Sequence, residues 1–376
     1  MPDKRRPNPL TIGEPAPWFR CATRLNDDFV FDTVAGRYIV LCFLGSAGSG
    51  ESREILDGIR AARSRFDDEH FAFFGVSREP SDMAHALYQD EIPGIRFFQD
   101  FDLGVSALYG ALTAEGAPRN LTYVLSPNLR VMAVLGSPGS TQLASLMALL
   151  DRLPAPPPAF AALPQAPVLV VPWIFEPALC RDLIAYYERL GGEDSGFMRD
   201  VDDKTTKIID YGHKRRRDRE VTDEKLRRAC MVRLHDRLGP EIEKAYQFRA
   251  TRMERHIVAC YEAADGGYFA PHRDNTTRGT AHRKFAVSLF LNAGEFEGGQ
   301  LRFPEYGNAA YTAPTGGAVV FSCSMLHEAT PVTKGKRYMF LPFLYDDAAA
   351  NLRTENEKYL DPATMAGAKA GESESS

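Results

Sequence analysis

The chain has 376 residues, of which 44% are hydrophobic and 25% are charged, and its formal net charge at pH 7 is −5. This length is ample for two soluble domains with cores of ordinary size, which need no disulfide or metal to fold. The small negative charge argues against a general attraction to nucleic acid or anionic membranes, and no segment approaches the roughly 18 consecutive apolar residues of a membrane span.

Strand and helix patterns alternate through the first 150 residues. Two unbroken apolar runs, YIVLCFL and HFAFFGVS, are typical of strands buried on both faces. A segment with helical spacing of apolar residues lies between them. The expected elements are strands over 38–44, 70–77 and 121–126 and helices over 52–66 and 81–89. This alternation predicts an α/β domain over residues 11–152.

A proline-rich stretch, LPAPPPAFAALPQAP, covers residues 153–167. Proline lacks an amide donor and fixes φ, so this stretch cannot join a helix or a central strand. We expect a semi-rigid linker between two domains. Residues 1–10 and 362–376 are expected to be mobile tails.

Helix patterns come first and strand patterns later in residues 168–350. The expected elements are helices over 176–190 and 223–246 and strands over 256–261, 284–292, 299–303, 318–322 and 337–344. Short strands separated by turn residues favour a sandwich or jelly roll. The pattern predicts an α+β domain, followed by a C-terminal extension over residues 351–376.

Three residues of this second half could hold a metal ion. In GGYFAPHRDN, His272 and Asp274 are two residues apart, and on a strand such residues face the same side. His327 follows the apolar run AVVF, in the segment SMLHEATPV. An H-x-D match alone is a weak signal, but two imidazoles and one carboxylate form the facial triad suited to iron(II), which leaves three coordination positions open.

Two further residues point to a carboxylate-bearing co-substrate. Arg337 begins the apolar strand RYMFLPFLY, ten residues after His327. Its planar guanidinium matches a carboxylate bidentately, and a charge facing into a barrel needs an anion as a partner. Tyr261, in the strand VACY, could donate a phenolic hydrogen bond to the same molecule.

Residues from about 255 to 347 resemble the prolyl 4-hydroxylase branch of the iron(II) and 2-oxoglutarate oxygenases. The matching segments are VACY, GGY with HRDN, SLFLN, EFEGGQLRFPEY, AVVF, HEATPV and KGKRY. The resemblance implies a double-stranded β-helix (jelly-roll) fold. It also implies that His272, Asp274 and His327 are the catalytic iron ligands and that Arg337 and Tyr261 bind 2-oxoglutarate. Phe290 departs from the family, because some members have a second tyrosine there.

The same resemblance implies an activity and its cofactors. The expected reaction is the hydroxylation of an amino-acid residue, either in a peptide, as in prolyl hydroxylation, or free, with release of succinate and CO2. Its cofactors would be Fe(2+), 2-oxoglutarate and O2, with L-ascorbate as an accessory reductant. Two alternatives remain open: a metal-dependent dioxygenase that does not use 2-oxoglutarate, and a non-enzymatic redoxin-based module that binds a partner or senses iron or oxygen.

Residues 11–150 resemble a peroxiredoxin or redoxin domain with a thioredoxin-like fold. The matching segments are IGEPAPWF, YIVLCFL, FFGVSREP, FFQDFDLGVSALYGA and PRNLTYVLSP, which contains Arg119. The loop GSAGSGES offers only serines where a peroxidatic cysteine belongs, and Cys42 lies within the preceding strand. We therefore expect no peroxidase activity, and a role in presenting substrate, binding a partner protein or forming a homodimer.

The cysteines and the N-terminal segment indicate the cellular compartment. The six cysteines contain no C-x-x-C pair, and no apolar signal segment follows the basic N-terminus, so we expect reduced thiols in a cytoplasmic protein.

The run HKRRRDRE over 213–220 favours a solvated loop, or a lid that attracts an acidic substrate, over a nucleic-acid patch. The expected partner is a small-molecule or peptide substrate, with no membrane.

Overall fold

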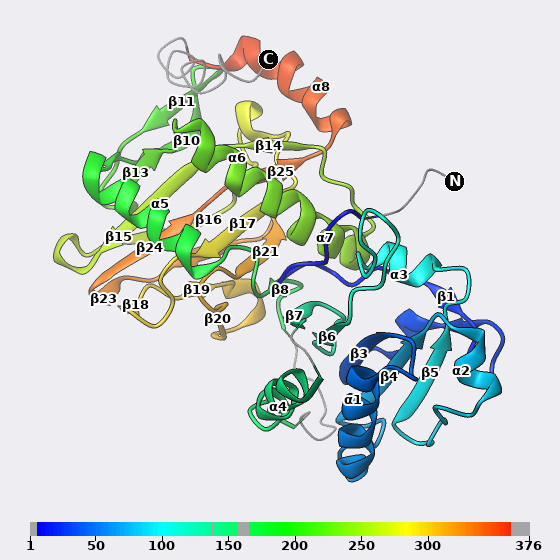
Figure 1. Cartoon of the computed structure of the whole chain (residues 1–376). Helices are drawn as coiled ribbons and strands as arrows, with labels where there is room; N and C mark the ends of the chain where they lie inside the picture. Colours follow the sequence, from blue (N-terminus) through cyan, green and yellow to red (C-terminus); the bar gives the residue numbers. More distant parts are fainter. Residues whose placement is uncertain (1–5, 137–138, 156–164, 362–376) are drawn as a thin grey trace. The chain divides into compact units, whose positions relative to one another are not determined.

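The computed structural model describes residues 6–136, 139–155 and 165–361 (Figure 1). The chain divides into two compact units, Met1–Phe160 and Ala161–Ser376. Most of the expected linker, residues 156–164, and the expected C-terminal tail, residues 362–376, lie outside the described residues. Within the described ranges, no helix is long and apolar enough to span a bilayer.

The first unit contains a five-stranded sheet with the order β5-β4-β3-β6-β7. Strand β3 pairs parallel with β4, and β4 pairs parallel with β5. At its other edge β3 pairs antiparallel with β6, which in turn pairs antiparallel with β7. The strands are β3 (Tyr38–Gly45), β4 (Phe71–Ser77), β5 (Ile95–Gln99), β6 (Leu121–Leu125) and β7 (Val131–Leu135), with a small hairpin of β1 (Arg20–Cys21) and β2 (Phe29–Val30). The helices are α1 (Gly50–Ala61), α2 (Pro80–Ala84), α3 (Gly104–Leu108) and α4 (Gly139–Leu150).

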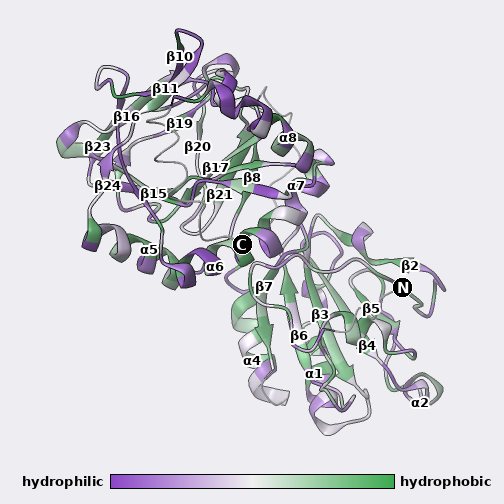
Figure 2. Ribbon diagram, turned by 90° about the horizontal axis from the view of Figure 1, so that it is seen from above, coloured by the Kyte–Doolittle hydropathy of each residue, from purple (hydrophilic) through white to green (hydrophobic). Residues whose placement is uncertain are grey.

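Strand β3 supplies both cores of this unit. All of its residues are buried. Ile39, Leu41 and Phe43 pack into one core with residues of α3 and the N-terminal segment. The alternate residues, Val40 and Leu44 among them, pack into the other core with α1 and α4. In Figure 2 the strands of this sheet are correspondingly hydrophobic along their length. The expected α/β thioredoxin-like fold, with a layer on each face of the sheet, is confirmed.

The expected N-terminal tail is wrong for residues 6–10. The side chain of Arg6 forms an ion pair with Glu14 at 2.6 Å. Leu10 is 1% exposed, and its amide donates to the hydroxyl of Tyr123 at 3.1 Å. An apolar residue thus anchors this segment beneath the sheet. The expected helix over 52–66 is also too long, since α1 ends at Ala61.

The serine-rich loop after β3 is fixed by hydrogen bonds to other parts of the same unit. The carboxylate of Asp82 accepts hydrogen bonds from the amide of Ala47 at 2.6 Å and from the hydroxyls of Ser46 at 2.9 Å and Ser77 at 2.6 Å. The hydroxyl of Ser52 donates to the carbonyl of Leu44 at 2.9 Å. The carboxylate of Asp82 therefore satisfies one amide and one hydroxyl of this loop from within the protein.

The second unit is built on two antiparallel sheets. The larger has the order β14-β25-β17-β24-β15-β13-β9, with β21 attached to β17 and β8 attached to β21, and the smaller has the order β12-β16-β22-β19-β20. The strands of the larger sheet are β8 (Leu169–Val171), β9 (Glu193–Asp194), β13 (Arg217–Glu220), β14 (Arg252–Glu254), β15 (Ile257–Glu262), β17 (Phe285–Phe290), β21 (Ala318–Ser322), β24 (Lys336–Phe340) and β25 (Phe343–Tyr345). Those of the smaller are β12 (Lys214–Arg215), β16 (Tyr268–His272), β19 (Leu301–Arg302), β20 (Ala310–Tyr311) and β22 (His327–Ala329).

Two two-stranded sheets and several helical segments complete this unit. One is the hairpin of β10 (Phe197–Val201) and β11 (Lys204–Ile208), and the other pairs β18 (Glu297–Gly298) with β23 (Val332–Lys334), which lies further along the chain. The helical segments are α5 (Pro177–Leu190), α6 (Glu224–Arg233), a π turn (Leu234–Leu238), α7 (Gly239–Tyr246) and α8 (Asp347–Asn356). The helix expected over 223–246 is thus interrupted by the π turn. The strand expected over 337–344 is split at Pro342, which cannot donate to the ladder.

Side-chain alternation on β15 and β24 separates the helices from the site. Val258, Cys260 and Phe340 pack against α5, α6 and α7 on the outer face of the larger sheet. Ala259, Tyr261 and Met339 lie in a second core, which also contains residues of the smaller sheet. The space between the sheets is where β16 and β22 face β15 and β24. The expected α+β double-stranded β-helix is confirmed.

Candidate metal centre

Three potential metal ligands meet on the smaller sheet. His272 ends β16, His327 begins β22, and the two residues are direct partners in the antiparallel register. Asp274 follows β16, where its amide donates to the carbonyl of Cys323 at 2.9 Å. The candidate ligand atoms of the three residues all lie within 4.8 Å of one another. The Nε2 atoms of His272 and His327 lie 3.6 Å and 3.3 Å from the Asp274 carboxylate.

Both imidazoles are oriented by their second nitrogen. The Nδ1 atom of His272 lies 2.8 Å from the carbonyl of Ala270, and that of His327 lies 3.0 Å from the carbonyl of Met325. A carbonyl accepts only from Nδ1–H, so each ring keeps its Nε2 lone pair free for a metal. The ring of Phe269 stacks on that of His272. These contacts hold both ligand atoms toward the carboxylate.

Burial and neighbouring charges set the protonation of Asp274 and His327. Desolvation, reinforced by the neighbouring His272, lowers the pKa of His327 to about 4. Burial alone would raise the pKa of Asp274, but His327, His272 and Arg283 outweigh it and hold that pKa below its ordinary value. At neutral pH the site therefore presents a carboxylate and a neutral imidazole at His327, as metal ligation requires. This donor set fits a divalent transition metal such as iron(II).

Arg337 lies on the facing sheet as a buried cation. It is 2% exposed and pairs in register with Tyr261. No carboxylate of the described residues lies within ion-pair distance of it, and its Nε atom has no hydrogen-bond partner there. Its guanidinium lies 5.0 Å from the ring centre of Tyr261 and 5.4 Å from that of Phe290. Burial, with some repulsion from Arg216, lowers the pKa of Arg337, although Tyr261 opposes this.

A buried cation of this kind is costly unless an anion joins it. The backbone opposite leaves room for the arginine, because Gly299 has a φ of +58° and a Cβ there would lie 2.8 Å from Cδ of Arg337. The residues therefore fit a dicarboxylate co-substrate. The hydroxyl of Tyr261 is held by Nη1 of Arg216 at 3.3 Å.

The basic run over 213–220 is not the expected solvated loop. It forms β12 and β13, so alternate side chains point in opposite directions. Lys214 is 4% and Arg216 is 8% exposed, whereas Arg215 and Arg217 face outward. Arg216 forms two 2.7 Å bonds with the carboxylate of Asp218. Sequence reasoning missed Arg216, and period-two alternation within a charged run was the signal that could have found it.

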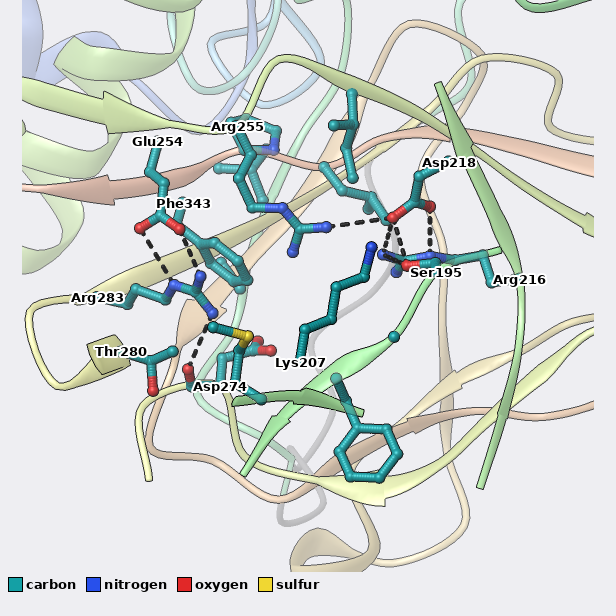
Figure 3. Close-up of a pocket in the computed structure, with 18 of the residues that line it drawn as sticks. Ser195, Lys207, Arg216, Asp218, Glu254, Arg255, Asp274, Thr280, Arg283 and Phe343 are labelled. Atoms are coloured by element: carbon teal, nitrogen blue, oxygen red, sulfur yellow. Dashed lines mark hydrogen bonds and ion pairs between the residues drawn. The ribbon is translucent and has the colours of Figure 1, made fainter. Parts of the chain in front are cut away.

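One large pocket joins these groups. It has a volume of about 1680 Å³ and is lined by the triad, by Tyr261, Arg216 and Arg337, and by residues of β10, β11 and α8. Figure 3 shows its polar interior, with charged side chains converging from several strands. Ligand pockets commonly have roughly 300–1,000 Å³, so this one has room for a co-substrate and a second molecule.

Several solved structures are similar to parts of this chain. A prolyl-4-hydroxylase from Pseudomonas putida covers 48% of the chain and 94% of its own length, with 19% identity and a TM-score of 0.38. A prolyl hydroxylase from Trichoplax adhaerens, in complex with a hypoxia inducible factor peptide, covers 50% and 87%, with 16% identity and a TM-score of 0.39. AhpC from Mycobacterium tuberculosis covers 39% and 97%, with 18% identity and a TM-score of 0.31.

Curated relatives match only part of the chain. A PKHD-type hydroxylase from Synechococcus sp. (strain JA-2-3B'a(2-13)) is 34% identical over 88 residues, which are 22% of this chain and 38% of the relative. Procollagen-lysine,2-oxoglutarate 5-dioxygenase 1 from Gallus gallus is 31% identical over 118 residues, which are 30% of this chain and 15% of the relative. The chain thus spans less than two fifths of the length of these relatives.

The family comparison covers the strands that build the site. Residues 256–345 match the family described as the 2OG-Fe(II) oxygenase superfamily. This range runs from β15 to β25 and includes the triad and Arg337. The C-terminal region of this chain therefore carries a domain of the 2OG-Fe(II) oxygenase superfamily.

Proposed function

We propose that this protein is an iron(II)- and 2-oxoglutarate-dependent dioxygenase that hydroxylates an amino-acid residue, either in a peptide or free. The observation that carries the proposal is the presence, in one pocket, of a convergent triad and a buried arginine without a carboxylate partner among the described residues. A ligand that joins the two must chelate a metal at one end and present an anion at the other. A 2-oxo dicarboxylate has this form.

The proposed roles follow from the positions of the side chains. His272, Asp274 and His327 would hold iron(II), and Arg337 would pair with the distal carboxylate of 2-oxoglutarate. Tyr261, held by Arg216, would add a hydrogen bond to the same carboxylate. When bound, iron and 2-oxoglutarate supply with O2 the oxidising chemistry that hydroxylates a C–H bond and releases succinate and CO2.

The chain's own contribution is orientation and the exclusion of water. The carbonyls of Ala270 and Met325 fix both imidazoles, and Phe269 and Phe321 cover them with apolar surface. Such fixed geometry lets the ligands bind without reorganisation. We expect L-ascorbate to prolong activity by keeping the iron reduced, which a time course with and without ascorbate would measure.

The test combines binding with turnover. Under anaerobic conditions, calorimetry should show one equivalent of iron(II) binding first and one of 2-oxoglutarate binding next. With O2, succinate release should rise in the presence of a substrate from a panel of peptides, free amino acids and small metabolites. His272→Ala should lose metal binding and this stimulated release, whereas the control His235→Ala, at an exposed position far from the triad, should retain both.

Each contrary outcome identifies a different alternative. Unchanged turnover in His272→Ala would overturn the ligand assignment. Turnover without 2-oxoglutarate would favour a dioxygenase that does not use this co-substrate. Iron binding without any turnover across the panel would favour a sensing role.

We further propose that residues 11–152 form a non-catalytic module that binds a partner protein or a second copy of the chain, and that the protein works in the cytoplasm. All six cysteines are free, which supports a reducing compartment. Sedimentation analysis of the full chain would show whether it self-associates, and a strict monomer would exclude the second copy.

A further inference from the structure

The inner part of the pocket carries more positive than negative charge. We define its inner charged cluster as five cations and three carboxylates: Lys214, Arg216, Arg255, Arg283, Arg337, Asp218, Glu254 and Asp274. Burial lowers the pKa of Lys214 well below its ordinary value. The four arginines stay charged, so the excess over the three carboxylates is at least one positive charge. Iron(II) and the 2-oxoglutarate dianion would cancel each other, so binding both leaves this excess in place. Excess buried charge is costly unless a further anion joins it.

Two of the cations are fully paired. Arg216 binds the carboxylate of Asp218 through two bonds of 2.7 Å. Arg283 binds the carboxylate of Glu254 through Nε at 3.2 Å and through a second, shorter bond from Nη2. These bidentate pairs satisfy both carboxylates geometrically. Neither arginine therefore requires an external anion.

Arg255 is only partly satisfied. Its Nη2 atom lies 3.2 Å from Oδ2 of Asp218, an oxygen that already accepts from Arg216 at 2.7 Å and from Ser195 at 2.5 Å. One carboxylate thus serves two arginines. The side chain of Arg255 is 29% exposed, and Figure 3 shows its guanidinium pointing into the pocket between the two bidentate pairs.

The position of Arg255 links the two ends of the proposed active site. Its guanidinium and that of Arg283 both lie over the ring of Phe343, at 5.4 Å and 4.1 Å from the ring centre. Arg283 reaches the carbonyl of Asp274 at 3.4 Å. On the other side, Asp218 connects Arg255 to Arg216 and so to Tyr261. A group bound by Arg255 would therefore lie beside both the metal and the co-substrate.

The backbone at Arg255 is also unusual. Its φ is +71°, in the left-handed region that is unfavourable for a residue with a side chain. Strained residues of this kind concentrate at ligand-binding positions. The strained conformation places the side chain within the pocket beside two other arginines.

From these contacts we propose that the substrate carries a carboxylate and that Arg255 binds it. This inference rests on the proposed function and names its substrate class. The carboxylate would complete the coordination of Arg255 and neutralise part of the excess charge. Its source is either an acidic side chain or a free C-terminus, and these differ in where the hydroxylated carbon lies relative to the carboxylate.

The experiment uses matched probes on the full chain loaded with Mn(II) and 2-oxoglutarate. One set consists of acetylated, amidated Gly-Pro-Xaa tripeptides with Asp against Asn and Glu against Gln. The other set consists of acetylated Gly-Pro-Ala with a free C-terminus against its amide. We expect the acid of at least one set to bind about ten-fold or more tightly than its amide, because charge-assisted bonds are among the strongest. The set that shows the preference identifies the source.

Variants then assign the preference to a residue. Arg255→Gln should remove it and Arg255→Lys should keep part of it, while the affinities for Mn(II) and 2-oxoglutarate stay unchanged. Arg249→Gln, an equal charge change at an exposed position outside the pocket, should keep it in full. The inference is overturned if no acid binds better than its amide, or if Arg255→Gln retains the preference. Failure of the wild type to bind Mn(II) and 2-oxoglutarate would instead contradict the proposed function.

Discussion

At Arg337 a permanent positive charge lies in the protein interior, and no carboxylate of the described residues balances it. Guanidinium cannot lose its proton at physiological pH, so the empty site bears the cost of desolvation. When a carboxylate binds, its attraction to the guanidinium offsets most of this desolvation cost, and this contributes to the affinity for the co-substrate. The co-substrate assignment depends on this one residue more than on any other.

Arg337→Gln should raise the KM for 2-oxoglutarate about 10- to 100-fold, since a bond to a charged group is worth roughly 1.5–3 kcal/mol. The affinity for the metal should not change, because Arg337 lies on the facing sheet. Losing an uncompensated buried charge should also leave the melting temperature of the empty protein equal or higher. Steady-state kinetics and calorimetry would measure these effects.

A matched control is available close by. Lys334→Gln removes a positive charge from an exposed side chain that pairs with Glu297. It should leave the KM for 2-oxoglutarate at the wild-type value. An unaltered KM in Arg337→Gln would show that another cation binds the distal carboxylate.

The sequence predicted those site residues whose type is unusual for their position, such as an arginine in an apolar strand. The two-residue spacing of His272 and Asp274 predicts that they share one side, and an arginine that opens an apolar strand predicts a buried anion site. Arg216 and Arg255 were not predicted, because charged residues usually face solvent. The period-two alternation of the charged run was a signal for Arg216, but it does not say which set of side chains faces inward, which the pairing of β13 with β15 decides. The positive φ of Arg255 depends on tertiary contacts.

At the level of elements, the hairpin of β10 and β11 lines the pocket but belongs to neither large sheet. Part of its attachment comes from Arg278 and Gly279, and part from the end of the described chain. The amide of Asp361 donates to the carbonyl of Thr205 at 3.1 Å, and Nζ of Lys204 donates to the carbonyl of Lys358 at 2.7 Å. The expected C-terminal extension is thus ordered through residue 361 and supports one wall of the site.

A chain that ends at Glu357 should therefore loosen this hairpin. It lacks both of these hydrogen bonds and keeps those from Arg278 and Gly279. Amide exchange across residues 197–208 should therefore accelerate about ten-fold, which corresponds to roughly 1.4 kcal/mol of lost local stability. Hydrogen–deuterium exchange with mass spectrometry would measure it. A chain that ends at Asp361 keeps the described contacts and should exchange like the full chain, and equal protection in both chains would contradict this role.

The elements that sequence patterns predicted well are those with long apolar runs. Strands β3, β4 and β21 begin and end within about a residue of expectation, because their burial dominates local preference. Short strands of mixed polarity, such as β10, β11 and β22, were missed. Strand β22 has only three residues, and its partner β16 lies far away in sequence. Strands β10 and β11 have five residues each and pair with each other, but they mix apolar, polar and charged residues without a clear period-two pattern.

For the whole molecule, the alternation of strands and helices in one half and the succession of short strands in the other were enough to predict two fold classes. The serines of the loop after β3 were also visible, because they stand where the resemblance to redoxins predicts a reactive cysteine. The hydrogen bonds that fix this loop could not be predicted from the sequence. Asp82 lies 30 residues beyond Ser52, and only the fold brings its carboxylate to the loop amide and hydroxyls.

All six thiols lie in surroundings that disfavour the thiolate. Desolvation is the largest cause at each, and it raises the pKa of Cys42 and Cys260 to about 11 and that of Cys21, Cys180 and Cys230 to about 12. The pKa of Cys323 is raised as well. The thiolate is the reactive form, so these groups should be inert at pH 7 and should react only as the pH approaches 11.

We therefore expect the native chain at pH 7 to consume hydrogen peroxide no faster than free cysteine does, and to react with a disulfide reagent at none of its thiols on the minute scale. Unfolding in guanidinium removes the desolvation, so all six should then react, which serves as the internal control. The other five thiols are buried and closed to the reagent in the native chain, whereas Cys21 is partly exposed. Cys21 should therefore react first as the pH is raised, although its pKa is not the lowest, and Cys21→Ser should abolish this first step. Rapid peroxide consumption by the native chain would mean that the redoxin half retains a peroxidase site despite its serine loop.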